Sequence, residues 1–530
     1  MKLKESAYQF TESDLQSNIQ VTGAIGTQKL HSIVSEFFSY LAQYKSSEAG
    51  LKPGVIVLDS SSSLHPHAYY HFMKADRAND LVQLHTVPSY SVVLEDVKTT
   101  KLSCFSGPQA HPFSAMAQLF AYNPRTTHES SLHLLETSPH ILDGKVFDVP
   151  RSMSDNVPAL KGVSEVKLRS IVQVEPSVRV NLLNLTGVQT PESVTTSVVE
   201  LLSEVSTQEI TFCKTWTLNA VKLYQRVRPN TEFTLLHLKE LTSQGLHSYL
   251  AELNKQPLLT AQDEELLSYF ACFLLTQTTK GSAVKFLQDL TIPIEDNMFL
   301  QKAYCSLNPN FKLDSIIEKG SILIVEHSTD SDLLKLMGTA IKCAFSNLAL
   351  TRHKSSLNQT RKVVLAVDDI SIFTTPESQS NYLQCLHTSS RSNTVNLVIT
   401  TQPSDMLFAA SYKGATNRQA ANYDTYLSAF QLHFIFGSSN PEPLESLANS
   451  YAPASPSSVS DDLRILLELN TELEFSRAIK QIRARLDSKE AIILNRNYWD
   501  LKLLPTNHSY PTMIRAYRHA ITCQQVVTAI

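Results

Sequence analysis

The sequence lacks the charge and the apolar runs that would mark several large classes of protein. Its 530 residues carry 46 Lys and Arg against 50 Asp and Glu, a formal net charge of −4. This balance excludes a global basic field, so any contact with nucleic acid must be local or shared among the subunits of an oligomer. No run of about 18 apolar residues occurs, which is what a membrane-spanning helix requires. We therefore expect no membrane span.

Cysteine pairs and a secretory signal are also missing. The seven cysteines are scattered and form no C-x-x-C pair, which argues for a reducing compartment and against a zinc site. The stretch from Met1 to Thr22 is polar, unlike a signal peptide. We expect a cytoplasmic protein.

The chain is long enough for about two or three domains. Strands and helices alternate at first, helical periodicity runs from Pro191 to about Leu290, and the alternation returns at Gly320. We predict an α/β domain with a mainly parallel central sheet covered by helices. Its first part is residues 1–180, an inserted all-α domain is residues 181–310, and its second part is residues 311–530. The stretch from Leu81 to Pro176 shows only short β-like runs between polar loops.

The segment from Ile19 to Leu41 has the strand–turn–helix pattern of a phosphate-binding loop. In such loops backbone N–H groups and a helix N-terminus bind phosphate, and a lysine reaches the terminal phosphates. We predict ATP and Mg²⁺ as cofactors. The residues assigned to nucleotide binding in this segment are Gly23, Gly26, Thr27, Gln28, Lys29 and Leu30.

The loop departs from the pattern G-x-x-x-x-G-K-[ST] at two positions. Gln28 stands where the second glycine belongs, and its Cβ hinders a close approach to phosphate. Leu30 stands where a hydroxyl belongs and cannot bind Mg²⁺. We therefore expect cofactor binding that is weakened or lost.

A second apolar run, Val55 to Leu58, ends in Asp59 and four serines. A fully apolar run is typical of a central parallel strand, and ligands bind at the carboxyl ends of such strands, so we assign Asp59 to nucleotide binding. The histidines His65, His67 and His71 follow. A metal site is one interpretation, but no H-E-x-x-H motif occurs and we favour polar surface.

The third chemical signal is the apolar run from Val363 that ends in Asp368 and Asp369. In phosphate-loop ATPases the first acid of such a pair holds the Mg²⁺ shell and the second orients or deprotonates the attacking water. We assign Asp368 to the metal and Asp369 to catalysis. Gln402 closes a neighbouring strand and is suited to the γ-phosphate or its water. The alternative is that the strands simply end in exposed polar residues.

This order of parts resembles the TraG/TraD-type coupling ATPases of conjugation and type IV secretion, within the HerA/FtsK group. The resemblance covers about Gln20 to Pro505. The sequence departs from the family at individual motifs, such as the missing proline near Asn181. The segments that carry it are Gly23–Lys29, Gly54–Asp59, Val180–Leu183, Gly320–Val325, Asp368–Asp369, Arg391 and Val395–Gln402.

The resemblance implies a RecA-like fold and a homo-oligomer, a hexameric ring with nucleotide between subunits. It implies DNA or nucleoprotein as substrate, proteins of the secretion or conjugation machinery as partners, and the inner membrane as a site reached through those partners. Arg391 would act on the neighbouring subunit's nucleotide, the alternative being a solvated cation at a helix end.

Two basic segments could contact DNA in the pore, although a solvated face is the alternative. Their cations are Arg352, His353, Lys354, Arg361 and Lys362, then Arg477, Lys480, Arg483 and Arg485.

Two further functions are compatible with these residues. One is a catalytically degenerate relative that acts as a structural or adaptor subunit. The other is a metal-dependent hydrolase built on the histidines and aspartates.

Overall fold

The structure is a computed structural model. It describes residues 8–23, 30–45, 50–61, 64–84, 86, 89–98, 102–108, 146–148, 165–187, 189–203, 210–275, 284–325, 330–354, 361–373, 379–400, 429–436, 490–495 and 500–505.

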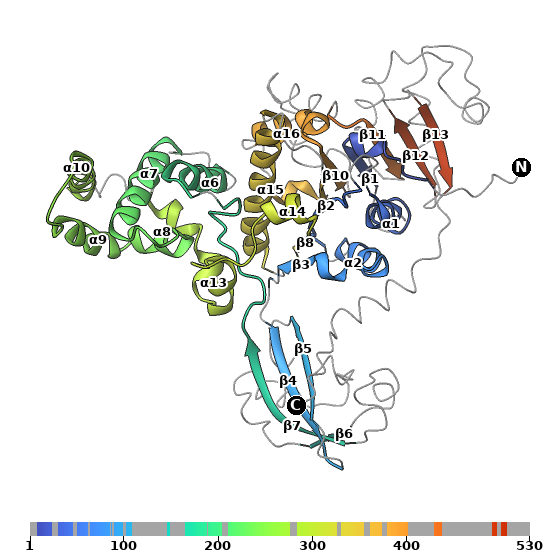
Figure 1. Ribbon diagram of the computed structural model, residues 1–530, viewed down its shortest axis with the longest axis horizontal. Coiled ribbons are helices and arrows are strands. Elements are labelled where there is room, and N and C mark those ends of the chain that lie inside the picture. Colours follow the sequence, from blue (N-terminus) through green and yellow to red (C-terminus); the bar gives the residue numbers. More distant parts are fainter. Residues whose placement is uncertain are drawn as a thin grey trace, which may run out of the picture.

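A nine-stranded sheet forms the centre of the molecule, in the order β13-β12-β11-β1-β10-β9-β2-β8-β3 (Figure 1). The seven strands from β11 to β3 are parallel, and β12 and β13 continue the sheet antiparallel. The strands are β1 (Ile19–Thr22), β2 (Gly54–Leu58), β3 (Leu81–Leu84), β8 (Ile322–Val325), β9 (Val363–Asp368), β10 (Thr394–Thr400), β11 (Leu432–Phe436), β12 (Glu490–Asn495) and β13 (Asp500–Pro505).

The predicted α/β class with a mainly parallel sheet is confirmed. The sheet continues beyond β12 with β13, a strand that the sequence pattern does not predict. Leu501 and Leu503 alternate with Lys502 there, a period-two signal too short to stand out without its partner β12.

The central strands are buried on both faces, as their apolar sequences predict. On β2, Val55 and Val57 pack into one core with α1 and α2, while Ile56 and Leu58 pack into the opposite core with α15 and α16. Full burial of each such side chain stabilises the folded state by about 1.5–3 kcal/mol. The helices that flank the sheet are α1 (Ser35–Gln43), entered through a π-helical turn (Leu30–Val34), α2 (His65–Lys74), α14 (Asp314–Lys319), α15 (Ser331–Lys354) and α16 (Gln379–Ser392).

Helix α15 is, within the described part of the chain, the one helix whose length and composition would suit a membrane span. In the window Ser331–Arg352, 72% is buried inside the fold. It packs against α16 and α6. Its apolar character is therefore explained by its place in the core.

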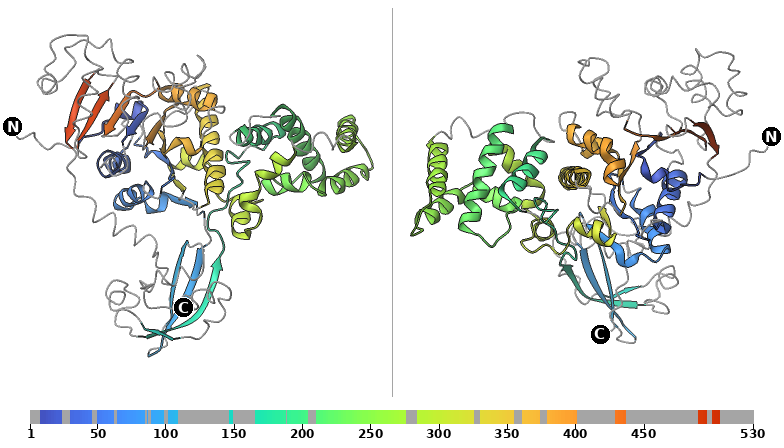
Figure 2. Two further views of the ribbon diagram at one scale, coloured as in Figure 1. Left: turned by 180° about the vertical axis from the view of Figure 1, so that it is seen from behind. Right: turned by 45° about the horizontal axis from the view of Figure 1, so that its top comes forward.

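A group of helices lies to one side of the sheet, beyond α15 (Figures 1 and 2). The residues from 235 to 254 form two helices, because a turn at Thr242–Gln244 separates them. The helices are α6 (Pro191–Ser203), α7 (Ile210–Val227), α8 (Leu235–Leu241), α9 (Gly245–Asn254), α10 (Ala261–Leu275), α12 (Ile292–Glu295) and α13 (Met298–Tyr304).

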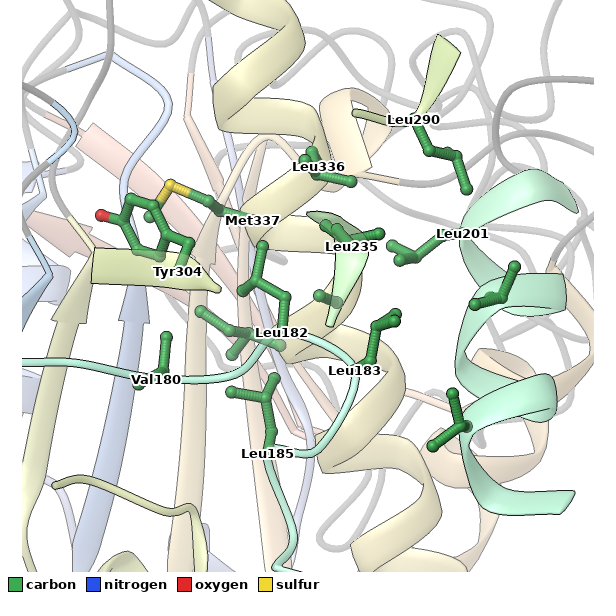
Figure 3. Packing of buried hydrophobic residues seen from close by; sticks show 14 of the residues in the cluster. Val180, Leu182, Leu183, Leu185, Leu201, Leu235, Leu290, Tyr304, Leu336 and Met337 are labelled. Carbon is green, nitrogen blue, oxygen red and sulfur yellow. The ribbon is translucent and has the colours of Figure 1, made fainter. Parts of the chain in front are cut away.

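The stretch from Val180 to Leu185 packs this helical group onto α15. Figure 3 shows its apolar side chains pointing into one cluster with Leu201 of α6, Leu235 of α8 and Met337 of α15. The same cluster continues to the sheet through Leu365 of β9 and its neighbours. The helical group and the sheet therefore share one apolar core. The side chains of the connecting stretch are Val180, Leu182, Leu183 and Leu185.

A second, antiparallel sheet of order β5-β4-β7-β6 projects away from the main one (Figure 1). The expected runs at Tyr90 and Ile171 lie in two of its strands, which pair with each other although they are far apart in sequence. The strands are β4 (Ser89–Asp96), β5 (Leu102–Pro108), β6 (Val146–Asp148) and β7 (Glu165–Val174).

Candidate nucleotide site at the carboxyl edge of the sheet

The carboxyl ends of four neighbouring strands meet at one edge of the main sheet. Leu58 of β2 pairs with Val367 of β9, so the residues that follow them, Asp59 and Asp368, lie side by side. On the other flank Asp368 pairs with Ile399 of β10. The ends of β1 and β10 are also in register. Segments from opposite ends of the chain thus converge where ligands bind to parallel sheets.

The predicted phosphate loop leaves this same edge. Gly23 follows β1 directly, and Leu30 begins the helical turn that enters α1. Because β10 alone separates β1 from β9, the start of the loop lies about 10 Å from the end of β9. Leu30 is half-buried and packs against the apolar core on the α1 side of the sheet. The predicted contacts Gly26, Thr27, Gln28 and Lys29 lie outside the described residues.

Asp368 ends β9 with a carboxylate that is almost fully buried, at 3% exposure. Its Oδ2 accepts hydrogen bonds from the hydroxyls of Ser61 and, at 3.3 Å, Ser60. In the sequence these serines stand out only as a polar run after a strand. The signal that could have found them is the parallel register, which brings the residues after β2 beside the end of β9.

Asp369 turns the chain at the end of β9. Its φ of 57° lies in the left-handed region, which is unusual for a residue other than glycine. Its N–H donates to the carbonyl of Ile399 at 2.8 Å, and the chain continues into a 3₁₀ turn, Ile370–Phe373. Lys342 of α15 donates to the carbonyl of Phe373 at 2.6 Å and fixes the far end of that turn. Such strained residues cluster at functional sites.

The structure gives Asp59 a different task from the predicted contact with nucleotide. Its side chain is fully buried, and Oδ2 accepts from the N–H groups of Leu64 at 3.0 Å and His65 at 2.8 Å. The Nδ1 of His65 lies 2.6 Å from the same oxygen, and the N–H of Ser61 donates to Oδ1. Burial would raise the pKa of this carboxyl, but the hydrogen bonds and charge of His65 outweigh it and lower the pKa. Asp59 therefore anchors the start of α2 and the serine turn.

The favoured interpretation of the histidines as polar surface is wrong. All three lie on α2, and His67 and His71 are buried. His71 Nε2 lies 2.8 Å from the hydroxyl of Ser35 on α1. Burial, with the charge of Lys74, lowers the pKa of His71 to about 4. Within the described residues, no group of three or more His, Cys, Asp or Glu side chains is arranged to hold a metal.

A magnesium ion that is bound together with a nucleotide needs fewer protein ligands than a group of three or more such side chains provides. Mg²⁺ keeps several waters and is held by one or two carboxylates together with the phosphates. The Asp368 carboxylate with its two neighbouring hydroxyls offers oxygen atoms of the kind that Mg²⁺ takes. These residues fit the predicted cofactor.

Arg391 lies in the last turn of α16, at the opposite, amino edge of the sheet. A helix of this length spans about 20 Å, so Arg391 and Asp368 of one chain are well separated. Gln402 lies outside the described residues, beyond the end of β10.

Three cations of the first basic segment are bound to groups within the fold. Arg352 is buried and donates to the carbonyl of Arg361 at 2.7 Å. Arg361 donates to two further carbonyls, and Lys362 to the Oδ1 of Asn393 at 2.9 Å. Burial lowers the pKa of all three cations. The second basic segment, at Arg477, lies outside the described residues.

No protein-family model matches the sequence, and no curated protein is significantly similar to it. Solved structures are similar over nearly the whole chain. The plasmid coupling protein TrwB in complex with ADP and Mg²⁺ is 10% identical, with a TM-score of 0.50 over 96% of this chain and 91% of that one. The chain has the fold of a conjugative coupling protein.

Two further structures are similar. The trigonal form of the bacterial conjugative coupling protein TrwBΔN70 with sulphate is 9% identical, with a TM-score of 0.50 over 95% of this chain and 89% of that one. VirB4 of Thermoanaerobacter pseudethanolicus is 10% identical, with a TM-score of 0.44 over 94% and 91%. The resemblance to coupling proteins, predicted from the order of the motifs, is thus confirmed at the level of the fold.

Proposed function

We propose that this protein is a nucleotide-binding ATPase of the coupling-protein type, which recruits or pumps DNA or a nucleoprotein substrate in conjugation or type IV secretion. The observation that carries the proposal is the meeting of the β1 and β9 ends at one edge of the coupling-protein fold. That edge joins Gly23, which opens the phosphate loop, to the acidic pair Asp368 and Asp369.

The positions of Asp368 and Asp369 support the roles proposed for them, and Lys29 and Gln402 keep the roles predicted from the sequence. Lys29 would neutralise the terminal phosphates, and Asp368 would hold the coordination shell of Mg²⁺, which screens charge on the phosphates when it is bound. Asp369 would orient the attacking water, and its left-handed backbone turns it away from the buried strand. Gln402 would bind the γ-phosphate or that water.

A second candidate is a subunit that recruits substrate without turning over ATP. It is favoured by Leu30, an apolar side chain half-buried against the core at the position where a magnesium-binding hydroxyl is expected. In this case nucleotide, if bound, would have a structural role.

Nucleotide titration separates these proposals from an unrelated function. We expect the Lys29→Ala variant to bind ATP with Mg²⁺ at least about tenfold more weakly, because one lost phosphate contact is worth about 1.4 kcal/mol or more. The matched control is Lys214→Ala, which removes an exposed cation of α7 and should bind as the wild type does. Equal binding by all three proteins would end the nucleotide proposal.

Turnover then distinguishes the two candidates. ATP hydrolysis that is stimulated by DNA and abolished by Asp369→Asn supports the motor. Binding without hydrolysis, with and without DNA, supports the adaptor subunit.

A ring with shared sites would place Arg391 of one subunit near the nucleotide of the next. Arg391→Ala and Asp369→Asn should each be inactive alone, because each lacks one half of every site. Mixed rings contain some interfaces with both halves intact, so mixing the variants should restore part of the hydrolysis. Mixtures that stay inactive would contradict the shared site.

A further inference from the structure

The serine turn after β2 carries a hydroxyl where the phosphate loop has lost one. Ser61 donates its hydroxyl proton to the Oδ2 of Asp368, the carboxylate assigned to Mg²⁺. Ser61 is exposed, whereas Asp368 behind it is buried. A ligand could therefore reach the serine oxygen from the solvent side of the carboxylate.

The position of Ser61 is built into the fold. Its backbone N–H donates to Asp59 Oδ1 at 3.1 Å. Asp59 is fully buried and is held by Leu64 and His65 at the start of α2. The carboxylate of Asp59 thus holds the backbone of the turn, and the Ser61 hydroxyl contacts the carboxylate of Asp368. A hydroxyl held in this way needs little reorganisation to bind a ligand.

The chemistry of this pair suits a hard cation. A hydroxyl has one proton and two lone pairs, so an oxygen that donates its proton to a carboxylate can also bind a cation. Oxygen atoms of hydroxyl and carboxylate groups are ligands that Mg²⁺ accepts. In phosphate-loop proteins the hydroxyl that binds Mg²⁺ follows the lysine of the loop, and here that position is Leu30, which is half-buried against the apolar core.

We propose that Ser61 is a magnesium ligand that takes over the task of the hydroxyl absent at Leu30. The proposal rests on the proposed nucleotide-binding function. It predicts that the absence of a hydroxyl at Leu30 weakens Mg²⁺ binding less than the loop sequence alone suggests, because Ser61, in the turn after β2, supplies an oxygen ligand.

The first test measures ATP affinity with Mg²⁺ and with EDTA. Ser61→Ala should reduce the gain in affinity that Mg²⁺ provides by about tenfold or more, as the loss of one ligand does in other metal sites. Its affinity in EDTA should equal that of the wild type. Ser61→Thr keeps the hydroxyl and should retain the gain, and the matched control is Ser243→Ala, which removes an exposed hydroxyl in the turn between α8 and α9. An unchanged gain in Ser61→Ala, or an equal loss with and without Mg²⁺, would overturn the proposal.

The second test separates ligation from the positioning of Asp368. Ser61→Cys replaces the hard oxygen by a soft sulfur, which binds Cd²⁺ better than Mg²⁺. Cd²⁺ should restore the metal-dependent gain in this variant and should do so less in Ser61→Ala. The absence of a difference between these two variants with Cd²⁺ would show that Ser61 does not touch the metal.

A double variant distinguishes this proposal from the function on which it rests. Leu30→Thr placed in the Ser61→Ala background returns a hydroxyl to the loop and should recover part of the gain. Wild-type protein that binds ATP with no role for Ser61 would leave the proposed function standing and refute this inference. Wild-type protein that binds no ATP at all would refute both.

Discussion

The two edges of the main sheet both bury charge, but they neutralise it in different ways. At the amino edge, Arg77 donates to the carbonyl of Pro53, just before β2, at 3.1 Å and to that of Gly320, near the start of β8, at 2.6 Å. At the carboxyl edge, Asp59 and Asp368 accept from N–H groups and serine hydroxyls in turns. Arg77 at the amino edge is thus bound mainly by main-chain carbonyls, and Asp368 at the carboxyl edge is bound by serine hydroxyls, which a ligand can also contact.

The difference teaches where function can lie in this fold. A buried cation that is bound to carbonyls holds the starts of neighbouring strands together, and Arg77, at 1% exposure, is out of reach of a ligand in solvent. A carboxylate that is bound to a hydroxyl retains lone pairs on its partner, so the pair can still take a cation. The amino edge should therefore respond to mutation through stability, and the carboxyl edge through ligand affinity.

The largest effect is expected for Arg77→Met at the amino edge. The guanidinium is 1% exposed and is shared by two carbonyls and Asp80. Removing it leaves those acceptors buried without a donor, which should cost about 3–5 kcal/mol in the free energy of unfolding. Urea denaturation followed by circular dichroism measures the loss.

The control for this prediction is Arg228→Met in the helical group, where the ion pair with Glu252 is exposed. Its urea midpoint should not move measurably. Equal midpoints for both variants would mean that the amino-edge carbonyls do not depend on Arg77.

A smaller loss is expected for Asp59→Asn at the carboxyl edge. The amide nitrogen would face N–H donors, so the variant should lose about 2–3 kcal/mol in the free energy of unfolding. Because folding lowers the pKa of Asp59, its contribution is present above the unfolded pKa and is lost as the pH falls through the folded value. The difference between wild type and variant should therefore shrink below about pH 4. A difference that grows in acid would contradict the assigned direction.

The sequence predicts the strands of the sheet better than it predicts the hydrogen-bond partners of the charged side chains at its two edges. The strands β2 and β9 were found because continuous runs of Val, Ile and Leu have few alternatives to burial on both faces. The partners of the charges could not be found. Arg361 reads as a cation in a polar loop, yet its acceptors are the carbonyls of Lys52 and Glu318, which only the assembled sheet brings near.

The same limit explains the errors around α2. The histidines suggested polar surface because the sequence shows neither Ser35 beside His71 nor Asp59 beside His65. Ser61 stands out in the sequence only as one of four serines after a strand. Its link to Asp368 follows from strand register, and register between strands about 300 residues apart has no local signal.

A buried histidine away from both edges offers a third comparison. Folding lowers the pKa of His71 to about 4 through burial and Lys74, so the folded protein binds this proton less well than the unfolded chain. Stability should fall as the pH drops from about 6.5 towards 4, with a loss of about 2 kcal/mol by pH 5. His71→Gln removes this titration and should flatten that part of the pH profile, measured by urea midpoints. An identical slope in wild type and variant would assign the pH dependence to other groups.

The smallest effect, and the finest test of the contrast between the edges, is expected for Lys362→Met. The ammonium group is partly buried and donates to Asn393 at the start of β10, so the variant should lose about 1 kcal/mol of unfolding free energy. Each lysine that contacts a DNA phosphate contributes about one unit to the slope of log affinity against log salt. A lysine committed to the amino edge contributes nothing to that slope, and the variant should keep the wild-type value for any DNA that the protein binds. A slope lowered by about one would place Lys362 on the phosphate backbone, and the amino edge would then be a functional surface as well as a structural one.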